Sequence, residues 1–450
     1  MAASMDPSYD MDDKIANDRE RNLSESSSTT AMEEKTEEEP QDLEESPVQL
    51  VPPPSSNTLA LLQVLGGFVL MFNSWGIANT FGAYQTFYEA NLLKNESPSN
   101  ISWIGSIQAF LLLIVGGVVT GPIFDAGYLR ALVLVGSVLV VFGMMMTSLC
   151  TEYWQIVLAQ GVVVGAGSGC MMLPAIAVIP QYFTTKRAFA TGVAASGSSI
   201  GGVIYPIVFH KLQPQIGFGW ATRIIGFIAL ATLMVPILCM RAKVFPSQKR
   251  PIIDFKVLRE VPWDLFNVGS FFGFMGMYIP FYYISTYSFE KGFVDENLAF
   301  YLLTIINTGS IFGRIVPNFF ADKVGPLNIT APWCLFCSII AFSWLSVSSL
   351  GQAVVFCLFY GFFSGTFVSI VGPALVTLSP DLSLIGTHMG MAFTFSAMGL
   401  LVGNPVAGVL LNKYGWIGPA MLCGTANVLA AIFVFIARVN RYGWKMTVKA

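Results

Sequence analysis

One arginine stands alone in a long apolar part of the chain. Between Glu296 and Asp322 the only charged residue is Arg314, within the run "FYLLTIINTGSIFGRIVPNFFAD". A guanidinium at membrane depth is costly unless it meets water or a partner, and its fork of N–H donors fits a carboxylate. Arg314 is therefore a candidate contact for an anionic or planar polar ligand. The alternative is an arginine that snorkels to the interface or is paired for structural reasons.

Uncharged polar side chains in other apolar runs extend this candidate site. Each can orient a ligand, although an Asn or Tyr in a membrane span also forms hydrogen bonds between helices. The group "YIPFYY" contains Pro280, which interrupts the helical hydrogen-bond ladder and predicts a bend. The predicted spans contain no free Asp or Glu. The candidate substrate-binding residues are Arg314, Asn79, Tyr84, Gln85, Tyr278, Tyr282 and Asn307.

Catalytic, metal and nucleotide chemistry find no support in the sequence. The two histidines, His210 and His388, lie near the ends of apolar runs, and no cluster has the spacing of metal ligands. No glycine-rich loop of the kind that cradles ATP phosphates is present. "WCLFC" at 333–337 matches C-x-x-C, but its apolar surroundings indicate packing. We expect no enzymatic activity, no cofactor, no metal and no nucleic-acid partner.

The composition identifies a membrane protein. Hydrophobic residues make up 54% of the 450 residues and charged residues 11%, and the mean hydropathy is +0.63. A helix that crosses a bilayer needs about 20 apolar residues. We predict an all-α membrane protein with twelve transmembrane helices, at 58–88, 101–122, 131–150, 154–178, 188–209, 218–240, 263–287, 298–321, 330–349, 352–376, 386–411 and 416–437.

Charge is distributed unevenly along the chain. The first 56 residues contain 15 acidic and four basic residues with Ser- and Pro-rich runs, which predicts a disordered tail. In the predicted loops, fourteen Lys and Arg residues lie on the side of both termini and five on the other side. The positive-inside rule then places both termini in the cytosol. We expect a monomeric, multi-pass protein of the plasma membrane.

Several motifs recur in the second half of the chain. Gly161 falls on Gly361, Pro206 on Pro405, and Asp125 near Asp322, all at a similar spacing. Such a duplication predicts two pseudo-symmetric six-helix halves with a cavity between them. We expect an acidic tail at 1–56, a first half at 57–240, a cytosolic linker at 241–262, a second half at 263–438 and a C-terminal tail at 439–450.

The spacing G-x-x-x-D-x-G-x-x-R in "GPIFDAGYLR" resembles the loop signature of the major facilitator superfamily. Stretches such as "WIGSIQ", "YFTTKRAFATGVAASGSSIGGVIYPIV" and "IFGRIVPNFFADKVGPLN" resemble the fungal branch of its monocarboxylate-porter family, from about residue 60 to 438. The resemblance implies the MFS fold. Asp125 and Asp322 occupy equivalent loops, where a carboxylate can accept hydrogen bonds from a helix terminus and hold a cytosolic gate shut. The predicted gating residues are Gly121, Asp125, Gly127, Arg130 and Asp322.

The sequence departs from this family at two positions. In its animal lactate and pyruvate carriers, an aspartate precedes the arginine of the eighth helix by four residues, where this chain has Ser310. Those carriers also use a lysine in the first helix, where Asn79 lies near the matching place. The resemblance therefore implies an incomplete proton-relay pair.

These observations predict a transporter that works by alternating access. We interpret its substrate as a small organic solute, a monocarboxylate or another organic anion, with protons as a candidate coupling ion and a symporter as the corresponding class. Two alternatives remain open: export of a secondary metabolite, and a nutrient sensor that does not transport.

Overall fold

The computed structural model describes residues 57–183, 186–242, 253–380, 384–445 and 448. The predicted acidic tail and most of the predicted linker lie outside these ranges. The described residues belong to one compact unit that begins at Pro53, and its regular structure is helical. The α-helices are α2 (Asn57–Asn73), α3 (Trp75–Asn79), α4 (Phe81–Phe87), α5 (Pro98–Ile114), α6 (Thr120–Asp125), α7 (Leu129–Thr147), α8 (Tyr153–Ile156), α9 (Gly165–Ala177), α10 (Arg187–Cys239), α11 (Val261–Met277), α12 (Ile279–Glu290), α13 (Glu296–Val324), α14 (Pro326–Ser343), α15 (Leu350–Leu378), α16 (Ile385–Tyr414) and α17 (Ile417–Tyr442).

Several α-helices continue through short π-helical or 3-10 segments. These are η1 (Tyr88–Leu92), η2 (Val115–Val119), η3 (Val157–Val164), η4 (Ile179–Gln181), η5 (Val257–Arg259) and η6 (Trp344–Ser346). With them, ten helices in the described part of the chain are long and apolar enough to cross a membrane. Two features account for the other two predicted spans.

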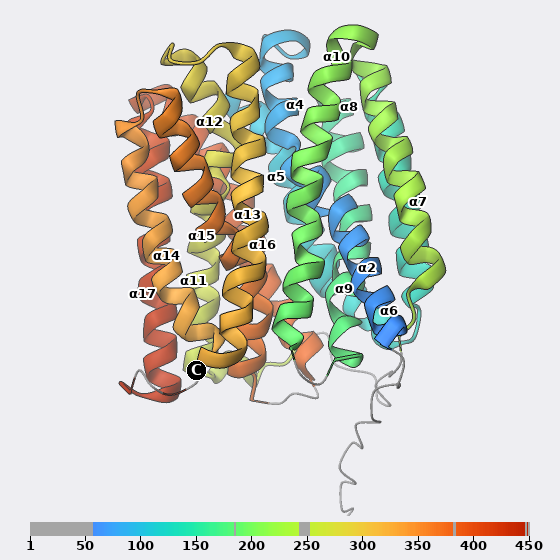
Figure 1. Cartoon of the computed structure of the whole chain (residues 1–450), viewed down its shortest axis with the longest axis vertical. Coiled ribbons are helices and arrows are strands. Elements are labelled where there is room, and N and C mark those ends of the chain that lie inside the picture. Colours follow the sequence, from blue (N-terminus) through green and yellow to red (C-terminus); the bar gives the residue numbers. More distant parts are fainter. Residues whose placement is uncertain (1–56, 184–185, 243–252, 381–383, 446–447, 449–450) are drawn as a thin grey trace, which may run out of the picture. The chain divides into compact units, whose positions relative to one another are not determined.

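The first feature is Gly217, inside the 53 residues of α10. Its φ of 78° lies in the region that favours glycine, and the backbone reverses there. Before it, Tyr205 donates to Asn73 of the first span. After it, Thr222 contacts Tyr84 and Thr232 contacts Asn73, so the chain there runs back along the first span. α10 therefore contains two antiparallel spans, and Figure 1 shows the chain turning back at the top and its later part descending on the right.

The second feature is the break between α11 and α12. α11 ends at Met277, Tyr278 caps it, and Pro280 lies in the first turn of α12. Proline is tolerated there because a first-turn N–H has no intrahelical acceptor. Each helix is too short to cross a bilayer alone, and together they occupy the predicted span 263–287. The predicted bend at Pro280 is confirmed.

The two sequence halves lie on opposite sides of the bundle. In Figure 1, α2, α6, α7, α8 and α9 lie on the right and α11, α14, α15 and α17 on the left, with α4, α5, α13 and α16 nearer the middle. The first helix begins and the last helix ends at the same end of the bundle, which we call the terminal face. The other end is called the opposite face.

The halves meet along two pairs of helices, α5 with α16 and α10 with α13. By the predicted repeat, α5 and α13 are equivalent second spans, and the first part of α10 and α16 are equivalent fifth spans. The two contacts are therefore exchanged by the pseudo-symmetry. Glycines let the backbones approach closely: a Cβ on Gly192 would lie 2.5 Å from the Arg314 carbonyl oxygen. This interface contains the candidate site.

Candidate substrate site between the halves

Arg314 lies in α13 at the interface and is 2% exposed. Its Nε donates to Ser310 Oγ at 3.3 Å, and its Nη1 donates to the Ala195 carbonyl oxygen of α10 at 3.2 Å. Arg314 has no carboxylate partner among the described residues, where the ion pair that is present joins His388 and Asp254. A buried guanidinium that bonds only to neutral oxygens carries an uncompensated positive charge.

A small crevice opens beside this guanidinium. About 180 Å³ of space in and around it is free of atoms, but hardly any of that space is wide enough for a water molecule. Both halves of the chain form it, since Asn79 comes from α3 and the rest from α11 to α15. The lining residues are Asn79, Met277, Tyr278, Phe281, Ser310, Arg314, Ser364, Gly365 and Val368. The structure therefore has a collapsed polar site rather than an open one.

Three of the predicted substrate-binding residues, Arg314, Asn79 and Tyr278, come together in this crevice. The Oδ1 of Asn79 is buried without a hydrogen-bond partner in the described structure. The ring of Tyr278 stacks on Trp75 across the halves, with ring centroids 5.7 Å apart. The Tyr278 ring, the unpaired Oδ1 of Asn79 and the Arg314 guanidinium, which has no carboxylate partner among the described residues, thus lie beside the same small space.

Two more predicted residues lie along the interface but outside the crevice. Tyr282 packs against Phe81 of the first half, with centroids 5.2 Å apart. Asn307 donates to the Leu303 carbonyl oxygen at 3.0 Å, and its own Oδ1 has no partner among the described residues. Both side chains therefore contact the first half, Tyr282 through Phe81 and Asn307 at Gly202, where a Cβ would lie 2.4 Å from its Oδ1.

The other two predicted residues point elsewhere. Tyr84 belongs to an aromatic cluster of the first half with Phe209 and Phe218, and its hydroxyl contacts Thr222 at 3.4 Å. Gln85 lies near the opposite face. Tyr84 and Gln85 are neighbours in the helix, so their side chains differ by about 100° in direction. Neither of them points into the crevice.

Two functional features were not predicted from the sequence. Ser310 stood out there only as a departure from a family pattern, yet it bonds to Arg314 and also to Ser199 Oγ of the first half at 3.1 Å. Its spacing of four residues from Arg314 was the available signal. The prediction that no span contains a free acid is wrong, because η1 continues the first span to Leu92 and includes Glu89.

The two ends of the interface are both closed. At the terminal face, a Cβ on Gly390 would lie 2.6 Å from the Gly117 carbonyl oxygen. At the opposite face, the hydroxyl oxygens of Ser102 and Tyr283 lie 2.8 Å apart. With the crevice collapsed and each end sealed by contacts between the halves, the structure corresponds to an occluded conformation.

The predicted gating residues lie at the terminal face. Asp322 accepts a hydrogen bond from the Phe189 amide, in the first turn of α10, at 3.3 Å. Gly127, with φ of 91°, follows α6, and Arg130 is exposed on α7. Gly121 has open space where a Cβ would lie, and the Asp125 side chain lies outside the described part. The Asp322 contact joins the two halves, as a gating role requires.

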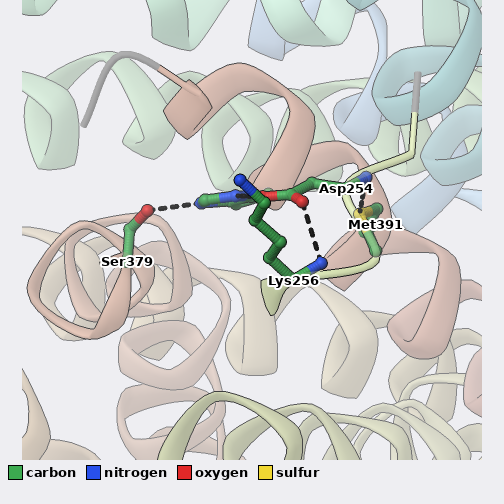
Figure 2. A network of polar contacts seen from close by, with 5 residues as sticks. Asp254, Lys256, Ser379 and Met391 are labelled. Carbon is green, nitrogen blue, oxygen red and sulfur yellow. Dashed lines mark hydrogen bonds and ion pairs between the residues drawn. The ribbon is translucent and has the colours of Figure 1, made fainter. Parts of the chain in front are cut away.

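A second polar cluster ties the linker to the terminal face (Figure 2). Buried His388 of α16 bonds through Nδ1 to Ser379 Oγ at 2.5 Å and through Nε2 to Asp254 Oδ2 at 3.1 Å. The Asp254 amide contacts Met391 Sδ at 3.4 Å. Partial burial raises the pKa of Asp254, but the His388 hydrogen bond and the Lys256 amide outweigh this and hold that pKa below its ordinary value. The cluster fastens the linker to the second half.

The fold and the interface define a transporter of two packed six-helix halves, and comparison with known proteins agrees. The Major Facilitator Superfamily model matches residues 59–383. The chain belongs to this superfamily. The crystal structure of the E. coli fucose:proton symporter superposes with a TM-score of 0.62 at 15% identity, over 84% of this chain and 98% of the symporter.

Curated relatives share much more of the sequence. The chain is 45% identical to MFS-type transporter dbaD of Emericella nidulans, over 84% of this chain and 86% of the relative. It is 37% identical to agnestins efflux protein AgnL12 of Paecilomyces divaricatus, over 86% and 90%. It is 38% identical to aspyridones efflux protein apdF of Emericella nidulans, over 81% and 74%. The protein is therefore an MFS transporter of the kind found in fungi, and not an enzyme.

Proposed function

We propose that the protein exports an acidic secondary metabolite by alternating access, and that Arg314 binds the acidic group. The observation that carries this proposal is the uncompensated guanidinium of Arg314, which is buried between the halves and bonded to neutral oxygens of Ser310 and Ala195. A carboxylate or phenolate would supply the missing negative charge and accept a forked hydrogen bond.

The crevice also favours a particular shape of substrate. Its aromatic side is formed by Tyr278 and Phe281, which line it beside Arg314, and Trp75 stacks on Tyr278 and supports that ring. Asn79 adds an amide oxygen that needs a donor. A substrate with an aromatic or planar ring, an acidic group and a hydroxyl or N–H donor satisfies all three.

The names of the relatives favour export over uptake of a monocarboxylate. Two of them are named as efflux proteins for agnestins and for aspyridones. Ser310 also stands where the animal monocarboxylate carriers have an aspartate beside the arginine. The monocarboxylate interpretation is therefore the weaker one. The plasma membrane, cytosolic termini and a monomer remain part of the proposal.

The test compares metabolites inside and outside cells that lack the protein or express it. One strain set carries the unaltered protein, a second Arg314→Gln, a third Arg314→Lys, and a fourth Arg223→Gln. Arg223 is the matched control, because its Nε also bonds to a serine hydroxyl, that of Ser148, at 3.0 Å, but away from the crevice. Signals are divided by the amount of protein in the membrane.

An acidic compound should accumulate outside cells with the unaltered protein and with Arg223→Gln, and stay inside with Arg314→Gln. Arg314→Lys should give an intermediate result, since a point charge replaces the fork. Export by Arg314→Gln at the unaltered rate per molecule would refute the role of Arg314. Movement of the compound into cells would refute export.

A further inference from the structure

Glu89 is an acidic side chain inside the first membrane span. It lies in the π-helical turn η1, near the opposite face, and is partly buried. Gln85, four residues earlier on the same side of the helix, donates from Nε2 to Glu89 Oε1 at 2.9 Å. The substrate crevice does not include Glu89, so the proposed function leaves this carboxyl group unexplained.

A chain of hydrogen bonds leads from Glu89 across the interface. Ser102 Oγ of α5 lies 3.4 Å from Gln85 Oε1 and 2.8 Å from the Tyr283 hydroxyl of α12. That hydroxyl in turn donates to the Asn404 carbonyl oxygen of α16 at 3.2 Å. Glu89 therefore ends a network that joins the first half to the second.

This network is the seal of the opposite face. Beside it, Ser99 Oγ donates to the Pro405 carbonyl oxygen at 3.1 Å, and a Cβ on Gly408 would lie 2.9 Å from the Tyr283 hydroxyl. One step deeper, a Cβ on Gly82 would lie 2.5 Å from the Phe281 carbonyl oxygen. The halves cannot separate at this end without breaking the hydrogen bonds of the network.

A second carboxyl group lies at the same end of the other half. Glu290, at the end of α12, accepts a hydrogen bond from Trp416 Nε1 at 2.9 Å, and the Trp416 ring lies 6.5 Å from the ring of Tyr283 in the seal, so Glu290 is close enough to repel an ionised Glu89. Tyr283 is a further titratable group of the seal, connected to Gln85 through Ser102, and its phenol stays neutral near pH 7. Lys291 follows Glu290 in the chain, but its ammonium lies 6.0 Å from the centre of the Tyr287 ring and forms no ion pair with either acid among the described residues. Acids from both halves thus lie at this seal, Glu89 within the hydrogen-bond network and Glu290 beside it.

We propose that Glu89 binds a proton when the opposite face is closed and releases it when that face opens. A protonated Glu89 is neutral, so it does not repel Glu290, and the seal holds. An ionised Glu89 repels Glu290 across the seam, and separation of the halves relieves the repulsion and restores its hydration. The open state then binds fewer protons than the closed state, so a rise in pH favours opening.

This proposal does not depend on the substrate and is tested without one. Cys150, Cys170 and Cys239, the partly exposed cysteines, are replaced by serine. Spin labels are then placed at Asn95→Cys in the first half and Lys413→Cys in the second, both exposed at the opposite face. Distances between the labels are measured in the full-length protein in nanodiscs, at about pH 5 and about pH 8.

In the otherwise unaltered protein, we expect a longer distance to gain several-fold in population at the higher pH. Glu89→Gln should remain closed at both pH values, because its amide is neutral and keeps the contact with Gln85. The matched control is Glu96→Gln, since Glu96 lies on the same face but bonds to Asn100, at 2.7 Å, outside the seal. It should respond to pH as the unaltered protein does.

Two results would overturn the proposal. One is a distance distribution of the unaltered protein that does not change with pH. The other is a pH response in Glu89→Gln equal to that of the control. If Glu89→Gln does not fold, Glu89→Asp replaces it, and that variant must keep a pH response with a displaced midpoint.

Discussion

The Nη1 atom of Arg314 donates a hydrogen bond to the carbonyl oxygen of Ala195, 3.2 Å away on the other half of the protein. This bond depends on the position of the halves, because α13 and α10 belong to different halves. When the halves rotate apart, Arg314 loses the Ala195 oxygen and its donor becomes free for a ligand. The occluded state thus holds the guanidinium with a neutral acceptor, which the acidic substrate that we propose would displace.

A carboxylate next to Arg314 should compete with the substrate. Ser310→Asp places an acid four residues before the arginine, and we expect transport to fall about tenfold or more, because a charge-assisted bond is worth about 1.5–3 kcal/mol. Ser310 is packed tightly against Gly365, where an added Cβ would lie only 2.4 Å from Ser310 Oγ, so a larger side chain at 310 has a steric effect of its own. Ser310→Asn, of equal size but without charge, is the control for that effect. Rates per molecule that are equal for the Asp and Asn variants would contradict competition by charge.

The two predicted tyrosines should respond differently to loss of the hydroxyl group. Tyr278 lines the crevice together with Arg314, so loss of one hydrogen-bonding group there in Tyr278→Phe should raise KM about 2- to 10-fold with little change in protein amount. Tyr84→Phe loses only a 3.4 Å contact with Thr222. It should lower the Tm slightly and leave KM unchanged. A KM change for Tyr84→Phe as large as for Tyr278→Phe would contradict this assignment.

Closure of the terminal face should depend on the absence of a side chain at Gly390. Gly390→Ala sets a methyl group 2.6 Å from the Gly117 carbonyl oxygen. Such overpacking costs about 1–3 kcal/mol, so we expect turnover to fall at least several-fold while the protein stays folded. Gly351→Ala is the control, since a Cβ there has open space and both changes gain helix propensity. Equal turnover of the two variants would show that the close contact is not needed.

Asp254 should stabilise the protein in a pH-dependent way. Its pKa is held below the ordinary value by His388 and the Lys256 amide against the effect of burial, so its contribution is present above about pH 4 and is lost below it. Asp254→Asn should lower the Tm at pH 7, measured by tryptophan fluorescence in detergent, and the difference should disappear as the pH falls below about 4. Glu260→Gln, a charge change in the same connection, should show no such dependence.

Much of the fold can be predicted from the sequence because the bilayer imposes a length on every apolar run. Arg314 could also be identified from the sequence, since it is the one charged residue in its apolar run. The directions in which the side chains point could not be predicted in this way. The first span is interrupted at Ser74 and Thr80 and ends in a π-helical turn. Such irregularities change the direction of the side chains that follow them, so the sequence alone does not say which of Asn79, Tyr84 and Gln85 faces the crevice.

The position of Glu89 illustrates a second limit. Hydropathy ends the first span at the last apolar residue, but the backbone remains helical to Leu92 because its hydrogen bonds must be satisfied within the segment. The acid is thereby carried into the interface. A partner from the other half, such as Tyr283, is far away in sequence, so the network could be found only from coordinates.

The reversal at Gly217 also bears on how the chain enters the membrane. Residues 187–216 and 218–239 are joined there by a single non-helical residue, and the polar stretch HKLQPQ at 210–215 is the helical end of the first segment. During synthesis the second segment follows the first as a helical hairpin, and this short polar stretch is the part between the two apolar runs that has to be translocated. A side chain at Gly217 would strain the turn of this hairpin at its φ of 78°. The two spans then insert into the membrane together, and a chain that fails at this step would leave both of them outside the bilayer.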